Sequence, residues 1–156
     1  MSTETMKSLF KIENIVGVKD ATSNIPRVYE SKTIIGENFI QLTGDDATTL
    51  AFMTYGGHGS ISVTSNIAPK LCSQFMQLCL SKDFAEAAKI NDKLMPLHHT
   101  LFVESSPGPV KYAASKLGLW QLTYVSAKYD KLLPTSFYLL TVKDFISLGE
   151  DKSRIT

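Results

Sequence analysis

The sequence predicts an α/β protein with a parallel sheet, because short apolar runs alternate with helical patterns in its first part. Each run is rich in β-branched residues and ends in a turn, and we expect strands over residues 15–19, 39–43 and 60–64. The segments between them, 26–31 and 47–55, have the spacing of crossover helices. Strands joined in this way run parallel. Three strands are too few to close a barrel, so we expect part of a larger sheet.

Helical patterns flank these strands. A first helix is expected over residues 2–11, with Ser2 or Thr3 as its cap and Glu4 in its first turn, where a carboxylate is favoured. Beyond the third strand the pattern is helical only, and we expect helices over residues 69–80, 84–98 and 110–117. The last segment, residues 120–156, is rich in aromatic side chains, and its pattern fits strand and helix equally well.

The composition is that of a globular protein, with 44% hydrophobic and 20% charged residues. A net charge of +1 without a basic stripe argues against nucleic acid as a partner. No apolar run is long enough to span a membrane and no signal-peptide pattern opens the chain, so we expect a cytoplasmic protein. Cys72 and Cys79 lie about two helical turns apart, which is too far for a disulfide within one helix and predicts reduced thiols.

Lys19 is the main candidate for chemistry, because it ends the first predicted strand. Parallel α/β folds place their functional residues at the C-terminal ends of strands. Apolar walls disfavour the charged ammonium form, and a neutral amine can attack a carbonyl group to form a Schiff base. The alternative is that Lys19 only extends from the strand end into solvent, as many lysines do.

The other polar candidates have simpler interpretations. Adjacent Asp45 and Asp46 suggest an acid–base pair, but carboxylates that follow a strand more often cap the next helix. His58 lies in a glycine-rich turn that ends a helix, which favours a structural role. His98 and His99 end a later helix, where a cation is favoured, and we expect no metal at either residue.

Five stretches carry a resemblance to a known family and occur in that family's order. They are residues 14–24 (NIVGVKDATSN), 42–48 (LTGDDAT), 56–66 (GGHGSISVTSN), 94–98 (LMPLH) and 102–118 (FVESSPGPVKYAASKLG). Together they resemble the dihydrodipicolinate synthase family, the 4-hydroxy-tetrahydrodipicolinate synthases, which are aldolase-like lyases. The resemblance extends from about residue 2 to residue 119.

This resemblance implies a partial TIM barrel, with residues 1–66 holding the last three strands of a (β/α)8 fold. Residues 67–119 would complete the barrel helices and form the C-terminal helical domain, and residues 120–156 would be a divergent tail. The implied reaction condenses pyruvate with aspartate semialdehyde in lysine and diaminopimelate biosynthesis. It uses no metal and no organic cofactor.

The resemblance also assigns roles to individual residues. Lys19 aligns with the lysine that forms a Schiff base with pyruvate, and Ile61 with the residue whose backbone carbonyl lies beside the bound pyruvate. Gly44, Asp45 and Asp46 align with a loop near the entry of the second substrate. The family's carboxylate-binding threonines, relay tyrosine and substrate arginine lie ahead of the matching part. This implies a complementary N-terminal barrel half, as in a split or decayed gene.

An opened barrel exposes apolar strand residues, and uncovering several of them costs several kcal/mol, at about 25 cal/mol per Å². That loss is comparable to the stability of a whole domain, so we expect the chain to form a homo-oligomer or to be marginally stable alone. The residues concerned are Val16, Val18, Ile40, Leu42, Ile61 and Val63.

Two alternatives remain open at this point. One is a sister pyruvate-dependent lyase on the same barrel, which acts on N-acetylneuraminate or on a keto-deoxy-sugar acid. The other is a non-catalytic remnant, either silent or an assembly partner. Ala21 and Thr22, and the strand expected at 60–64, fit the synthase better than the sister lyases.

Overall fold

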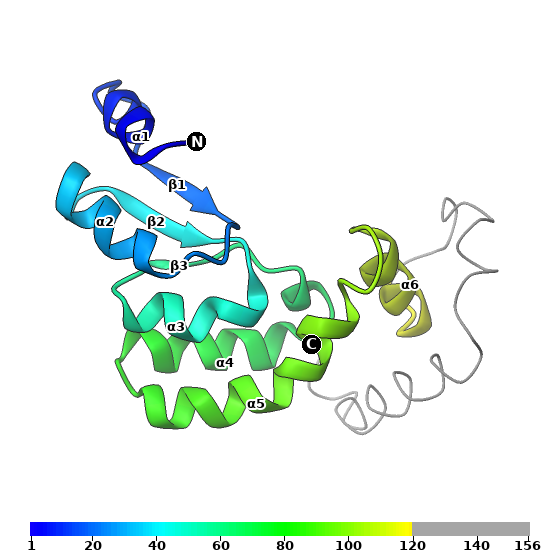
Figure 1. Cartoon of the computed structure of the whole chain (residues 1–156). Coiled ribbons are helices and arrows are strands. Elements are labelled where there is room, and N and C mark those ends of the chain that lie inside the picture. The colour runs from blue at the N-terminus through cyan, green and yellow to red at the C-terminus, as the bar shows by residue number, and fades with distance from the viewer. Residues whose placement is uncertain (120–156) are drawn as a thin grey trace.

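The computed structural model describes residues 1–119, which form a three-stranded parallel sheet and the helices packed around it (Figure 1). The strands are β1 (Gly17–Asp20), β2 (Ile40–Thr43) and β3 (Gly59–Ser60), in the order β1-β2-β3. The predicted α/β class with parallel strands is therefore confirmed. The predicted divergent tail, residues 120–156, lies outside the described residues.

The register of the sheet brings the C-terminal ends of the strands to one edge. Lys19 is the partner of Leu42, and Thr43 is the partner of Ser60. Both pairings are parallel. The segments that follow the three strands therefore meet at the same edge of the sheet, as in other parallel α/β folds.

Most helices begin and end close to the residues that the sequence predicts. Helix α1 (Thr3–Leu9) begins after Ser2, whose Oγ accepts a hydrogen bond from the Thr5 N–H at 3.2 Å, as predicted. Helix α2 (Pro26–Ile35) follows β1 and extends beyond its predicted end at residue 31. It stops at Gly36, whose φ of 122° is a conformation that favours glycine.

The segment after β2 is a short 3-10 helix, η1 (Asp46–Thr48), which continues into α3 (Thr49–Thr54). The C-terminal helices are α4 (Pro69–Leu80), α5 (Phe84–Thr100) and α6 (Gly108–Lys116). The bounds of α4 are those predicted from the sequence, because Pro69 opens the helix and the apolar spacing holds to its end. None of the helices in residues 1–119 combines the length and apolar character needed to cross a membrane.

The third strand is shorter than predicted. It covers only Gly59–Ser60, and Thr64, the last residue of the expected strand, begins the 3-10 helix η2 (Thr64–Asn66). The reason is a side chain from elsewhere, because the Asp46 carboxylate accepts the backbone N–H groups of Val63 and Thr64. Those N–H groups are thus unavailable to a sheet ladder, and the prediction of a strand over 60–64 was wrong for that reason.

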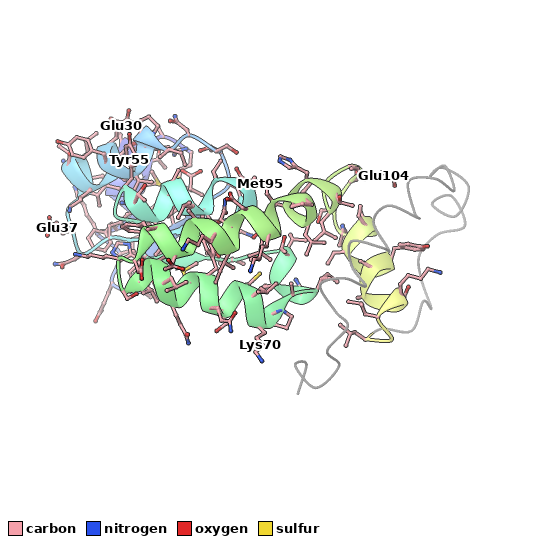
Figure 2. The ribbon with its side chains drawn as sticks, turned by 90° about the horizontal axis from the view of Figure 1, so that it is seen from below. Glu30, Glu37, Tyr55, Lys70, Met95 and Glu104 are labelled. Atoms are coloured by element: carbon pink, nitrogen blue, oxygen red, sulfur yellow. The ribbon has the colours of Figure 1, made fainter. Side chains whose placement is uncertain are left out.

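The main core lies where α3, α4 and α5 stack side by side below the sheet (Figure 1). Figure 2 shows α4 and α5 from another side, still adjacent, with Lys70 on one and Met95 on the other. The buried residues of this core are Met53, Phe75, Cys79, Ala87, Leu94 and Leu97. A second cluster, Ile67, Leu101 and Val110, joins η2 to α6. Cys72 and Cys79 are free thiols, as predicted.

Candidate functional site

The two faces of the sheet differ in how they are covered. Gln41 and Thr43 on β2 are buried, and Gln41 Nε2 donates to the Val28 carbonyl oxygen of α2 at 3.0 Å. Successive strand residues point to opposite faces, and paired residues of neighbouring strands share a face. Leu42 and its partner Lys19 therefore lie on the face opposite to α2. On that face Ile40 is 40% exposed and Lys19 is also exposed.

Lys19 thus stands at the C-terminal edge of the sheet, on the face that α2 does not cover. Its neighbour Asp20 points to the α2 side, where its carboxylate lies 3.4 Å from Arg27 Nη1. The Asp20 carboxylate also accepts the Thr22 N–H at 2.8 Å. Among residues 1–119, no carboxylate forms an ion pair with the Lys19 ammonium group.

Gly44 lies directly against the Lys19 side chain. A Cβ atom added at Gly44 would overlap Lys19 Cε and would lie 3.0 Å from Ala21 Cβ. The Gly44 N–H donates to the Asp20 carbonyl oxygen at 2.7 Å, which extends the β1–β2 pairing by one step. The absence of a side chain at residue 44 therefore lets the lysine pass directly over the backbone, and a larger residue there would displace the end of the lysine.

Asp45 connects the loop after β2 to the loop after β1. Its carboxylate accepts hydrogen bonds from the hydroxyl groups of Ser23 and Thr48. Ser23 has a φ of 58°, a conformation uncommon for serine. The side chain of Asp45 bonds no backbone N–H of η1, so the expected helix cap is absent.

Asp46 connects the same loop to the segment after β3. It is 3% exposed, and its Oδ2 accepts the N–H groups of Val63 at 2.9 Å and Thr64 at 3.0 Å. The Thr64 hydroxyl lies 3.2 Å from the same oxygen. Asp46 therefore caps η2, a helical turn far along the chain, instead of the helix that follows it. The adjacent carboxylates of Asp45 and Asp46 bond different loops, which does not fit an acid–base pair.

Ile61 lies at the end of β3, next in register to Gly44. Its N–H donates to the Thr43 carbonyl oxygen at 2.8 Å, and its side chain is 48% exposed. No hydrogen-bond donor within residues 1–119 reaches the Ile61 carbonyl oxygen. This oxygen is therefore free to accept a hydrogen bond from a bound molecule.

The histidines divide into one confirmed prediction and one wrong prediction. His58 is structural, as predicted, because its Nδ1 accepts the Gln41 N–H at 3.1 Å and its own N–H donates to the Gln41 carbonyl oxygen at 2.9 Å. His98 is not an exposed cation at a helix end. It is 4% exposed, and burial lowers the pKa of its imidazole. The helical spacing could have predicted this burial, since residues 91, 94 and 98 lie on the buried side of α5.

A small hollow lies beside the candidate site, between α2 and α3, and does not include Lys19. Its lining combines the β1–α2 loop with residues of β2, η1 and α3: Asp20, Thr22, Ser23, Asn24, Ile25, Thr43, Thr48 and Phe52. Within the described part of the chain, no three His, Cys, Asp or Glu side chains gather closely enough to hold a metal ion.

The model of the Dihydrodipicolinate synthetase family matches residues 1–129. The chain belongs to this family. The 4-hydroxy-tetrahydrodipicolinate synthase of Afipia carboxidovorans is 60% identical to it over 118 residues, which are 76% of this chain and 40% of the relative. The enzyme of the same name from Bradyrhizobium diazoefficiens is 56% identical over 118 residues, with the same two shares.

Solved structures of family members have the same arrangement of elements. The chloride-inhibited dihydrodipicolinate synthase of Acinetobacter baumannii, complexed with pyruvate, superposes with a TM-score of 0.80 at 34% identity, over 95% of this chain and 50% of that one. The 4-hydroxy-tetrahydrodipicolinate synthase of Methylacidiphilum fumariolicum gives a TM-score of 0.82 at 33% identity, over 97% and 50%. The chain thus spans about 40% of the length of these curated relatives and about half of these solved chains.

Proposed function

We propose that this chain provides the Schiff-base lysine of a 4-hydroxy-tetrahydrodipicolinate synthase, a lyase that condenses pyruvate with aspartate semialdehyde. Lys19 is the residue that forms the imine. The observation that carries the proposal is the position of Lys19 at the C-terminal edge of a parallel sheet, over Gly44 and on the face opposite to α2. Chemistry in parallel α/β folds is found at this edge.

The reaction starts when the neutral amine of Lys19 attacks the keto carbon of pyruvate. Loss of water leaves an imine, which withdraws electrons and lets the neighbouring methyl group lose a proton. The resulting enamine carbon attacks the aldehyde carbon of the second substrate, and hydrolysis of the new imine releases the product and restores the lysine. In this proposal the Ile61 carbonyl oxygen lies beside the bound pyruvate. The loop of Gly44, Asp45 and Asp46 lies near the entry of the aldehyde.

The three strands are, in this proposal, the last three of a (β/α)8 barrel. Exposed apolar side chains of the sheet region support it, because Val16 is 58%, Ile40 40% and Ile61 48% exposed. Further support comes from solved relatives about twice as long as the matched part. A complementary segment with the first five strands would provide the groups that bind the pyruvate carboxylate and relay the proton. A homo-oligomer and a cytoplasmic location belong to the same proposal.

The choice of substrates rests on the curated relatives. Those at 60% and 56% identity both carry the name 4-hydroxy-tetrahydrodipicolinate synthase. This supports aspartate semialdehyde over N-acetylneuraminate or a keto-deoxy-sugar acid as the partner of pyruvate. A condensation assay that compares the three substrates, with the complementary segment of a relative present, tests this choice.

Borohydride trapping tests the lysine. The full chain is incubated with pyruvate and borohydride, alone and with the complementary segment, and the reduced adduct is mapped by peptide mass spectrometry. We expect the adduct at Lys19, its loss in Lys19→Arg, and its retention in Lys70→Arg, which changes an exposed lysine on α4. An adduct spread over many lysines would contradict the proposal. No adduct even with the complementary segment would favour a non-catalytic remnant.

A further inference from the structure

The segment that leaves β3 is held by a chain of three buried polar side chains. Asp46 accepts the N–H groups of Val63 and Thr64, as described above. The Thr64 hydroxyl oxygen lies 3.2 Å from Asp46 Oδ2 and 2.8 Å from His98 Nδ1. Thr64 is 0% and His98 4% exposed. One chain of contacts therefore joins the loop after β2, the segment after β3 and helix α5.

The direction of these hydrogen bonds follows from counting hydrogens. A threonine hydroxyl has one hydrogen to donate. Asp46 Oδ2 already accepts two N–H groups and so acts as an acceptor, which directs the Thr64 hydrogen toward it. The Thr64 oxygen must then accept the hydrogen of His98 Nδ1. A neutral imidazole with its hydrogen on Nδ1 has a bare nitrogen at Nε2.

The buried environment keeps this imidazole neutral. Burial is the largest influence on the pKa of His98 and lowers it, although the carboxylates of Asp46 and Asp45 act in the opposite direction. The nearby His99 lowers the pKa further. Nε2 is buried and has no partner within residues 1–119, so a proton there would meet no acceptor from this part of the chain.

We propose that Asp46, Thr64 and His98 are positioning residues that fix the segment after Ile61, so that the Ile61 carbonyl oxygen stays in place beside the pyruvate imine. This rests on the proposed function. The Ile61 N–H still bonds the Thr43 carbonyl oxygen of β2, but beyond it the N–H groups of Val63 and Thr64 go to Asp46 instead of to a neighbouring strand. Buried hydrogen bonds with fixed direction give such a segment one defined position. None of the three side chains has to touch the substrate.

The decisive variants are Thr64→Val, which removes the hydroxyl and keeps the branched shape, and Thr64→Ser, which restores the hydroxyl. Thr54→Val is the matched control, because the Thr54 hydroxyl on α3 bonds only the Ala51 carbonyl oxygen of its own helix. Each variant is made in the full chain. Ring nitrogen chemical shifts report the tautomer of His98, and hydrogen exchange reports the amides of residues 63 and 64.

In the unmodified chain we expect His98 with its hydrogen on Nδ1 and a bare Nε2. Thr64→Val should abolish this preference and raise exchange at residues 63 and 64 by about tenfold, the factor that corresponds to one ordinary hydrogen bond. Thr64→Ser and Thr54→Val should match the unmodified chain. An unmodified His98 with its hydrogen on Nε2, or unchanged exchange in Thr64→Val, would overturn the proposal.

The link to pyruvate is read from the dependence of trapping at Lys19 on pyruvate concentration. Thr64→Val should raise the half-saturating concentration by about tenfold, with little change in the limiting rate, because a contact to bound pyruvate is misplaced while the amine is intact. An unchanged half-saturating concentration would show that the three residues are only structural. No trapping at all in the unmodified chain with the complementary segment would remove the proposed function, and the tautomer and exchange would still decide whether the side chains fix the segment.

Discussion

The contact between Gly44 and Lys19 gives the sharpest test of how the amine is placed. Gly44→Ala adds a methyl group that would overlap Lys19 Cε. Carbon atoms in contact prefer separations of about 3.5–4.0 Å, so the end of the lysine must move by on the order of 1 Å. Displacement of a reacting group by that amount can cost about 100-fold in rate. We therefore expect trapping of pyruvate at Lys19 to slow by up to about two orders of magnitude.

Stability should change little in the same variant. The atom that gives way is the far end of a flexible side chain, and replacing glycine by alanine reduces the entropy of the unfolded chain, an effect worth about 0.4–1 kcal/mol. Gly59→Ala is the control, since its Cβ would meet only Leu42 Cδ2, at 3.3 Å. The assay pairs urea unfolding with the trapping rate. The geometric reasoning would be refuted if the Gly44→Ala variant trapped pyruvate at the unmodified rate. It would also be refuted if the variant lost trapping only because it was unfolded under the assay conditions.

Three further predictions concern the body of the protein. Burial lowers the pKa of His98 from its ordinary 6.5, so the unfolded state binds more protons than the folded state below that pH. The free energy of unfolding should therefore fall as the pH decreases. His98→Asn should remove this part of the pH dependence, and His99→Asn should not. Burial raises the pKa of the Cys72 thiol to about 11 from 9.0, so a thiol reagent at pH 8 should react roughly a hundredfold more slowly than with an ordinary cysteine until urea is added. Leu94→Ala should cost about 2–5 kcal/mol in urea unfolding, since Leu94 is 0% exposed. Leu80→Ala, at a position 61% exposed, should stay within about 0.5 kcal/mol.

Local signals were sufficient wherever the structure depends on local sequence. Helix α4 begins at Pro69 and ends at Leu80, where the apolar spacing ends. Lys19 stands at a strand end because a β-branched run stops there. The end of α2 was placed too early, although Gly36 carried the stop signal, because the β-branched residues before it do not favour a helix.

Long-range contacts account for the predictions that failed. The Asp46 carboxylate accepts the N–H groups of Val63 and Thr64, which lie 17 and 18 residues further along the chain and are then unavailable to a strand. No local sequence pattern around residues 63 and 64 predicts this contact. The burial of His98 follows from helical spacing, but its hydrogen-bond partner, Thr64, depends on how α5 packs against η2. The close contact between Lys19 and Gly44 is also long-range, because Lys19 lies in β1 and Gly44 directly follows β2. The position of Lys19 near a strand end is thus readable from the sequence, whereas the contacts around it require the fold.

The consecutive carboxylates of Asp45 and Asp46 have a consequence for tolerance to insertions and deletions. Because neighbouring residues reach loops on either side, adding or removing a single residue between Gly44 and Ala47 would shift both attachments at once. At the opposite edge, the turn of Glu37 and Asn38 is exposed, and Glu37 projects from the surface (Figure 2). Within the described residues, its side chain makes only an exposed ion pair with Lys32, at 3.0 Å, and bonds no other loop. Peptide tags or extra loops introduced there should leave the edge that holds Lys19 undisturbed, which makes that turn the natural place for labels and fusions.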